Sequence, residues 1–302
     1  EIYGTSAGAD LTVLGESNGL LRRLNKGESK GPLFTSCCPA WVNFCEKNYP
    51  ELLKDVSTCK SPMEMFAALI KEENKNSSRK PVHVAIMPCT AKKFEAVREE
   101  FIVDGASSVD YVITTQELIQ MIKEAGIIFS ELDPEAIDMP FGTMTGAGVI
   151  FGVTGGVTEA VLRRLATDKS STGLMALSDQ GVRGMEGVKE TSIMYGDKEV
   201  KIAIVSGLKN ASDLIERIKA GEHYDFVEVM ACPGGCVSGA GQPFGRLEEK
   251  ELRGAGLYSA DKLCNVKRSE ENPLMMELYS GVLKGRVHEL LHVHYKEDKE
   301  AH

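Results

Sequence analysis

Two short apolar runs, each ending in a cysteine, limit the fold of this chain more than any other feature of its sequence. Residues 81–87 (PVHVAIM) lead into Pro88-Cys89, and Phe226–Met230 leads into Ala231-Cys232. Both runs have the length and composition of buried β-strands. Because open α/β sheets bind ligands at the carboxyl ends of their strands, the sequence predicts that both cysteines lie in a binding cleft.

Helix-start signals alternate with such strands along the chain. Pro39 suits the first turn of a helix that ends at Pro50. Ser61 and Thr114 each begin a capping sequence, which predicts two further helix starts. The remaining predicted helices cover residues 20–24, 157–165, 211–220 and 273–283, and the remaining strands cover 111–113, 191–195 and 198–205. This order predicts an α/β fold with one mainly parallel sheet or two.

The composition excludes several other classes of protein. The chain has 302 residues, and its net charge of −9 argues against nucleic acid as the main partner. No run of about 18 apolar residues is present, so no membrane span is expected. No charged-then-apolar leader is present, so no signal peptide is expected. The chain begins at Glu1 rather than Met, as a processed or truncated piece of a longer protein would.

The cysteines are the candidate functional residues, and they stand at positions 37, 38, 45, 59, 89, 232, 236 and 264. They lack the dense short spacings of a disulfide framework, so reduced thiols or metal ligands are favoured. Cys232 and Cys236 form a close pair, and the glycines between them allow a tight turn around a bulky group. Four thiolates suit an iron–sulfur cluster or zinc, and spacing alone leaves both open beside unligated core thiols.

Five of these cysteines lie in three longer motifs, namely residues 35–41 (TSCCPAW), 87–95 (MPCTAKKFE) and 228–243 (EVMACPGGCVSGAGQP). They resemble the three signature loops of the FeFe-hydrogenases, the iron-only hydrogenases that carry the H-cluster. The resemblance extends to residues 8–12, 61–62, 112–115, 146–156 and 285–292, and so covers most of the chain. It implies a catalytic H-domain over residues 1–302 that lacks its usual N-terminal start.

The resemblance also implies an architecture for this domain. It has two lobes, at about residues 1–130 and 131–245, whose mainly parallel sheets are flanked by helices. The cofactor is expected in the cleft between the lobes. Residues 246–302 are expected to form a C-terminal covering segment.

The implied cofactor is the H-cluster, a 4Fe–4S cubane joined through a cysteine sulfur to a diiron unit with CO, cyanide and azadithiolate ligands. Carried over by motif, the cubane ligands are Cys38, Cys89, Cys232 and Cys236, with Cys236 also bridging to the diiron unit. The residues expected to bind the cofactor are Met87, Pro88, Lys92, Met230 and Gly235. The expected catalytic residues are Cys37 as the relay thiol, Glu16 and Ser57 next along the proton path, and Lys92 against a cyanide.

One departure from the family pattern concerns the proton path. The family's path continues from Ser57 to a second glutamate, but that place falls on Gly19, which cannot relay a proton. We therefore expect a rerouted exit, through water or through another carboxylate such as Glu95. Met63 and Ala240 also replace residues that are common in the family.

The resemblance implies the reaction 2H⁺ + 2e⁻ = H2. The expected partners are a ferredoxin-type electron donor, or a missing N-terminal iron–sulfur module, and the maturation proteins that supply the diiron unit. An anaerobic, cytoplasmic setting is expected on the same ground. The alternatives are an H2 sensor with the same cofactor, a non-catalytic iron–sulfur assembly protein, and a zinc-structured module. The presence of Cys37 disfavours a sensor, and Cys37, Lys92 and Met230 together disfavour an assembly protein.

Overall fold

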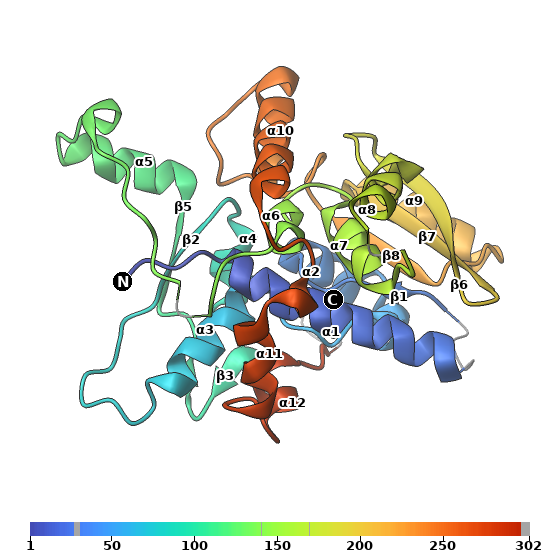
Figure 1. Ribbon diagram of the computed structural model, residues 1–302, viewed down its shortest axis with the longest axis horizontal. Helices are drawn as coiled ribbons and strands as arrows, with labels where there is room; N and C mark the ends of the chain where they lie inside the picture. Colours follow the sequence, from blue (N-terminus) through green and yellow to red (C-terminus); the bar gives the residue numbers. More distant parts are fainter. Residues whose placement is uncertain (27–30, 140, 169, 297–302) are drawn as a thin grey trace.

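Helix α1 (Ser6–Lys26) runs through the middle of the molecule (Figure 1) and packs against the helices at residues 62–73, 146–150 and 156–165. The structure is a computed structural model that describes residues 1–26, 31–139, 141–168 and 170–296. The sequence predicts a helix only at residues 20–24, because residues 8–14 of α1 are buried on every side and show no polar face. No helix within the described residues has the length and apolar content needed to cross a membrane.

The larger sheet, as described, joins strands in the order β1 (Leu33–Phe34), β8 (Phe226–Met230), β7 (Lys198–Ser206) and β6 (Val188–Tyr195). Strands β1, β8 and β7 are parallel, whereas β6 and β7, which contain the predicted strands 191–195 and 198–205, form an antiparallel hairpin. Alternate residues of β7 face opposite ways. Ile202 and Ile204 pack with α1 and α7 (Gly156–Leu165), and Ala203 and Val205 pack with α2 (Pro39–Asn48) and α9 (Leu208–Lys219). Helices therefore cover both faces, as predicted.

Within the described part of the chain, two further sheets have two strands each: one, named the smaller sheet, pairs β2 (Val84–Met87) in parallel with β5 (Tyr111–Thr114), and the other pairs residues 102–103 with residues 106–107 in antiparallel fashion. The prediction of a fully buried strand at residues 81–87 is wrong, because Val84 is 52% and Ile86 47% exposed. Only one face of this sheet packs against other described residues, among them those of α3. Strand β8, in contrast, is buried at every position, as predicted.

The elements around the smaller sheet begin at the predicted capping sequences. Ser61 Oγ accepts a hydrogen bond from Glu64 N at the start of α3 (Pro62–Glu73). Thr114 and Glu117 form a complete capping box at the start of α5 (Thr115–Glu124). The other elements of this region are η1 (Pro50–Asp55), α4 (Ala91–Glu95), η2 (Glu99–Phe101), β3 (Ile102–Val103), β4 (Ala106–Ser107) and η3 (Phe129–Glu131).

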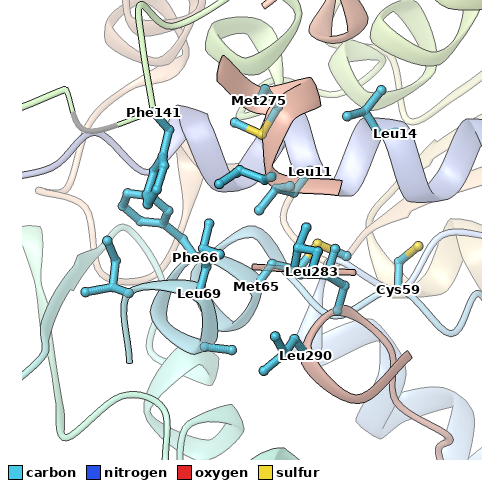
Figure 2. Close-up of a cluster of buried hydrophobic side chains, with 14 residues drawn as sticks. Leu11, Leu14, Cys59, Met65, Phe66, Leu69, Phe141, Met275, Leu283 and Leu290 are labelled. Carbon is cyan, nitrogen blue, oxygen red and sulfur yellow. The ribbon is translucent and has the colours of Figure 1, made fainter. Parts of the chain in front are cut away.

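The C-terminal part of the chain packs against α1 and α3. Figure 2 shows Leu11 and Leu14 of α1 beside Met65 and Leu69 of α3, with Met275, Leu283 and Leu290 closing the cluster. Helix α10 (Leu247–Leu263) was not predicted, because its apolar and polar residues are not segregated on opposite faces. The remaining elements are α6 (Gly146–Ile150), α8 (Ser171–Leu177), η4 (Ser178–Val182), η5 (Cys236–Ser238), η6 (Ser269–Glu271), α11 (Pro273–Ser280) and α12 (Val287–Leu291).

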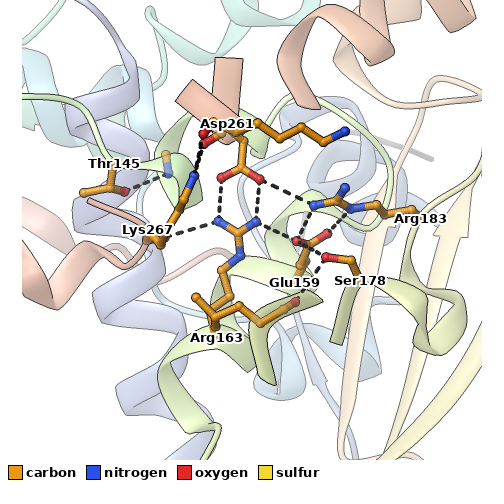
Figure 3. A network of polar contacts seen from close by, with 10 residues as sticks. Thr145, Glu159, Arg163, Ser178, Arg183, Asp261 and Lys267 are labelled. Atoms are coloured by element: carbon orange, nitrogen blue, oxygen red, sulfur yellow. Dashed lines mark hydrogen bonds and ion pairs between the residues drawn. The ribbon is translucent and has the colours of Figure 1, made fainter. Parts of the chain in front are cut away.

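A buried network of ion pairs joins α7 to α10 and to the segment after η4 (Figure 3). Arg163 Nη2 lies 2.7 Å from Glu159 Oε1 and 2.7 Å from Asp261 Oδ2. Arg183 Nε lies 2.7 Å from Glu159 Oε2. Because all of these charges except that of Arg183 are almost fully buried, each needs its partners to offset the loss of hydration.

We expect Arg163→Met to lower the free energy of unfolding by about 3 kcal/mol or more, because it leaves the buried Asp261 carboxylate without its bidentate partner and removes one of the two arginines that pair with Glu159. Urea denaturation of the purified chain measures this change. The control is Lys209→Met, which breaks an ion pair whose lysine side chain is 86% exposed and should cost at most about 0.5 kcal/mol. Equal stabilities for the two variants would contradict a structural role for the network.

Candidate metal centre

Three cysteine loops lie at the carboxyl ends of parallel strands. Strand β1 leads to Cys38, which precedes the first residue of α2, and β2 leads through Pro88 to Cys89. Strand β8 leads to Cys232, and Cys236 begins the short η5 turn. The predicted placement of Cys89 and Cys232 just beyond strand ends is therefore confirmed. The two sheets thus both deliver cysteines to one region of the molecule.

Backbone hydrogen bonds hold the three loops against one another. Gly241 N donates to Pro88 O at 2.9 Å, which joins the third loop to the second. Ala231 N donates to Cys38 Sγ at 3.4 Å, which joins the third loop to the first. Thr154 N, two residues before α7, donates to Gly234 O at 3.2 Å and so joins the third loop to the segment that leads into α7. The positions of the cysteines are therefore set by protein contacts.

Glycines allow the third loop to approach the second so closely. A Cβ atom on Gly239 would lie 2.1 Å from Pro88 O, and one on Gly241 would lie 2.9 Å from Cys89 N. Gly235 has a φ of +91°, which L side chains rarely adopt, and a Cβ there would lie 2.9 Å from Met230 Sδ. These glycines leave no room for a side chain between the loops.

The four cysteines influence one another electrostatically. Burial raises the pKa of Cys236 to about 12, and the nearby Cys38 and Cys89 add to this effect. Burial also raises the pKa of Cys38 and of Cys232, and neighbouring cysteines again contribute. Four thiolates at these positions would repel one another strongly. A bound metal group would reverse this balance, because thiolates that ligate metal ions are deprotonated.

The donor set fits an iron–sulfur cluster better than zinc. Within the described residues, no three Cys, His, Asp or Glu side chains converge closely enough to hold one metal ion. A zinc site needs four donors at about 2.0–2.3 Å from a single ion. The four thiols are close enough to raise one another's pKa values but not to share one ion. Four partly buried thiols spaced in this way suit a cluster of several irons.

A buried lysine lies beside the thiols. Lys92 Nζ, on α4, donates to Glu95 Oε2 at 2.7 Å and to the backbone oxygen of Cys37 at 3.3 Å. Ser61 Oγ donates to the same Glu95 oxygen at 3.0 Å. Burial lowers the pKa of Lys92, but the charge and hydrogen bond of Glu95 outweigh burial and the net pKa is raised. The side chain is therefore a fixed cation at the edge of the cysteine site.

The structure also brings Cys37, Glu16 and Ser57 together. Burial raises the pKa of Cys37 well above its usual value, and the nearby Glu16 charge adds to this. Glu16 is fully buried, and burial raises its pKa to about 7 although Ser57 and Ser36 oppose the shift. Neither carboxyl oxygen of Glu16 has a hydrogen bond of normal geometry within the described residues. Ser57 Oγ accepts from Cys59 N at 3.2 Å, so its own proton is available to Glu16.

The two methionines of the motifs are buried in two different apolar clusters. Met230 is buried beside Cys37 in a cluster that includes residues of α1 and α7. Met87 is buried beside Met63 and Val109 on the side of the smaller sheet. Their thioether side chains add no charge and exclude water where they pack.

Glu228 is a residue of the site that sequence reasoning missed. It is fully buried on β8, two positions before Met230, and accepts hydrogen bonds from Gly155 N and Thr158 N at 2.7 Å each. It thereby fixes the first turn of α7 to the strand that leads to Cys232. The signal was a charged residue inside an otherwise apolar strand, which requires a partner when the strand is buried.

We expect Gly239→Ala to reduce incorporation of an iron–sulfur cluster, because the added methyl group would force the second and third loops apart. Iron and sulfide analysis after anaerobic reconstitution, with the visible absorption of the cluster, measures this loss. The control is Gly256→Ala on α10, where an added Cβ meets no atom within 4 Å. Normal iron content in Gly239→Ala would show that the close approach is not needed.

The raised pKa of Glu16 makes stability depend on pH. The folded carboxyl keeps its proton up to about pH 7, whereas the unfolded one loses it near 4.5, so stability falls as pH rises between these values. A shift of this size corresponds to about 3 kcal/mol. The Glu16→Gln variant should not show this part of the fall in unfolding free energy between about pH 4.5 and pH 7. Urea denaturation at several pH values in that range measures the difference. Asp10 and Glu64 also have raised pKa values, but they are present in the wild type and in Glu16→Gln and so affect the two stability curves equally. Parallel stability curves for the two proteins would contradict the assignment.

Comparison with known proteins places this geometry in a family. Residues 1–240 match the model of the iron-only hydrogenase large subunit, C-terminal domain, and residues 247–298 match that of the iron hydrogenase small subunit. The chain is 43% identical to an NADP-reducing hydrogenase subunit of Solidesulfovibrio fructosivorans, over 97% of this chain and 53% of that protein. It is 38% identical to iron hydrogenase 1 of Clostridium pasteurianum, over 98% of this chain and 54% of that protein. The chain therefore spans about half the length of these curated relatives.

Other relatives differ in their described role. The cytosolic iron-sulfur assembly component 3 of Rattus norvegicus is 31% identical over 87% of this chain and 59% of that protein. Among solved structures, an [FeFe]-hydrogenase from a study of stepwise H-cluster assembly matches with a TM-score of 0.80 and 38% identity, over 98% of this chain and 84% of that one. The family models cover nearly all of the chain, and the mixed α/β fold agrees with the hydrogenase structure. The chain belongs to the iron-only, or FeFe, hydrogenase family.

Proposed function

We propose that this chain catalyses the reversible reduction of protons to H2, 2H⁺ + 2e⁻ = H2, at an H-cluster. The observation that carries the proposal is the buried Lys92 ammonium, held by Glu95 and by the Cys37 carbonyl beside the cysteine loops. A site for a cubane alone needs thiolates, and it has no use for a buried cation and an extra thiol. We also propose that electrons come from a ferredoxin-type carrier or from an iron–sulfur module of a longer protein.

The residues that would hold the cofactor follow from the donor set. Cys38, Cys89, Cys232 and Cys236 would bind the cubane, and Cys236 would also bridge to the diiron unit with its CO, cyanide and azadithiolate ligands. Met87, Pro88, Lys92, Met230 and Gly235 would surround that unit. When bound, the H-cluster would supply the redox-active iron at which H2 is formed or split. Maturation proteins would deliver the diiron unit, in an anaerobic cytoplasm.

The side chains of the site have separate roles in this proposal. Lys92 offers an ammonium group with donors to spare, and such a group suits an anionic cyanide. Its contact with Glu95 holds the ammonium in place and keeps it charged. Met87 and Met230 exclude water without adding charge. Gly235 allows the loop of Cys236 to pass close to Met230 Sδ.

Protons would move along the side chains next to the site. The Cys37 Sγ would exchange a proton with the site on one side and with the Glu16 carboxyl on the other. A carboxyl whose pKa is about 7 gains and loses protons readily near neutral pH, which suits a relay in both directions. Ser57, whose hydroxyl proton is available, would connect Glu16 to the exterior.

The assembly-protein relatives define the main alternative function. A non-catalytic chain would need the four thiolates but neither Cys37 nor the Lys92–Glu95 pair. Both features lie at the site here, and they support the catalytic function over the alternative. The same thiol argues against an H2 sensor of low turnover.

The test is anaerobic H2 evolution from reduced viologen by the full chain loaded with the cubane and a synthetic diiron complex. We expect cofactor-dependent H2 production. Cys37→Ala should keep the infrared bands of the bound diiron unit yet lose about 10²–10⁴-fold in rate, because one proton-transfer group is removed. Cys264→Ala, which removes a thiol from the end of α10, is the matched control and should keep its rate.

Three outcomes would contradict parts of this proposal. A correctly loaded wild-type chain that makes no H2 would favour the assembly function or the sensor. Full activity in Cys37→Ala would remove this thiol from the proton path. A normal infrared signature in Cys236→Ala would show that another residue bridges to the diiron unit.

A further inference from the structure

A hollow of about 490 Å³ lies along one stripe of α1, directly beyond the proposed relay residues. Its walls include Gly15, Gly19 and Arg22 of α1, together with Ser57, Thr58 and His292 from the facing segments. Positions 15, 19 and 22 recur at helical spacing and so lie on one face of α1. Because exposed residues form its rim, the hollow connects Ser57 with solvent.

Gly19 keeps this hollow open. A Cβ atom there would meet one neighbour within 4 Å, the methyl carbon Cδ2 of Leu33 at 3.3 Å. The residue sits inside a helix, where glycine is less favourable than alanine and where its φ is not in the left-handed region. The backbone geometry therefore does not require glycine at this position, and an added Cβ would press only on the end of the flexible Leu33 side chain. What its missing side chain provides is free volume beside Ser57.

The charge around the hollow is positive on balance, because its lining carries Arg22, Arg23, Lys26 and Lys54 against the single carboxylate of Asp55. Arg22 forms no ion pair or hydrogen bond with the described residues, whereas the neighbouring Arg23 is paired with Asp55. The pKa of His292, whose Nδ1 lies 2.9 Å from Thr58 Oγ1, depends on the electrostatic potential in the hollow. Burial lowers its pKa to about 4, and the positive groups of His288, Arg22, His294 and Lys60 lower it further. A small anion would enter this hollow more readily than a cation.

We propose that the hollow binds a small oxyacid anion, such as dihydrogen phosphate, that carries protons to and from Ser57. This inference rests on the proposed function. During H2 formation the O–H bond of the bound acid breaks, and a new O–H bond forms at Ser57 Oγ. The original Ser57 proton passes to the Glu16 carboxylate, and the anion leaves with one more negative charge. During H2 oxidation the same protons move in the opposite direction. A diffusible acid thereby replaces the side-chain carboxyl that Gly19 lacks.

Binding is tested first, without turnover, on the full chain that carries the cubane but no diiron unit. Titration with inorganic phosphate, followed by calorimetry or by ³¹P line broadening, should show saturable binding. Arg22→Ala should weaken binding by about tenfold, as loss of one charge-assisted hydrogen bond would. Gly19→Gln should abolish it by filling the hollow. Lys209→Ala, which removes a positive charge from α9, should leave it unchanged. Absence of saturable binding, or equal binding in Arg22→Ala, would overturn the proposal.

Turnover is tested second, on the fully loaded chain at one fixed pH and ionic strength. The rate of H2 evolution should rise and saturate with phosphate, and should respond much less to a cationic buffer of similar acidity. Gly19→Glu should make the rate independent of phosphate, because a tethered carboxyl then occupies the hollow. Gly19→Gln should be slow at every phosphate concentration. Equal responses of the wild type to both buffers would overturn the proposal. A chain that makes no H2 in any buffer would instead refute the proposed function, and the binding titration would still decide what the hollow holds.

Discussion

The close contact between the backbone of residues 239–241 and that of Pro88-Cys89 is the constraint on which the candidate metal centre depends. It joins the loop after β8, in the larger sheet, to the loop after β2, in the smaller sheet. Three of the four candidate ligands stand on the larger sheet and its loops, and Cys89 alone stands on the smaller one. Burial and mutual repulsion of the thiols oppose this arrangement. Backbone hydrogen bonds and glycines that permit close approach offset that opposition.

Buried charges are arranged around this contact so that each supports a different element. The Lys92–Glu95 pair fixes α4 beside the first cysteine loop, and Ser61 ties the same carboxylate to the start of α3. Glu228 fixes the first turn of α7 to β8. Farther out, the Arg163 network fastens α10 onto α7. Burying any of these charges without its partner would cost free energy. Each contact therefore favours the particular pair of elements that it joins.

The sequence predicted those features that depend on neighbouring residues. Cys89 and Cys232 were placed correctly because a strand and the turn after it are close in sequence, and the capping sequences located the starts of α3 and α5. Features set by distant contacts were missed. The full length of α1, the burial of Glu228 and the exposure of Val84 depend on which elements pack together, and periodicity does not contain that information. For the proton exit the sequence left water or Glu95 open. The structure gives Glu95 partners at Lys92 and Ser61, and places a hollow beside Gly19.

The difference in burial between β8 and β2 means that the two halves of the centre rest on supports of unequal local stability. A sheet of two strands is marginal by itself, and β2 leaves Val84 and Ile86 in contact with solvent. Transient opening of the native protein would therefore begin at β2 and β5, where amide hydrogens should exchange sooner than those of β7 and β8. Such an opening would withdraw Cys89 while Cys38, Cys232 and Cys236 stayed in place. Cys89 is therefore the candidate ligand that rests on the less stable of the two supports.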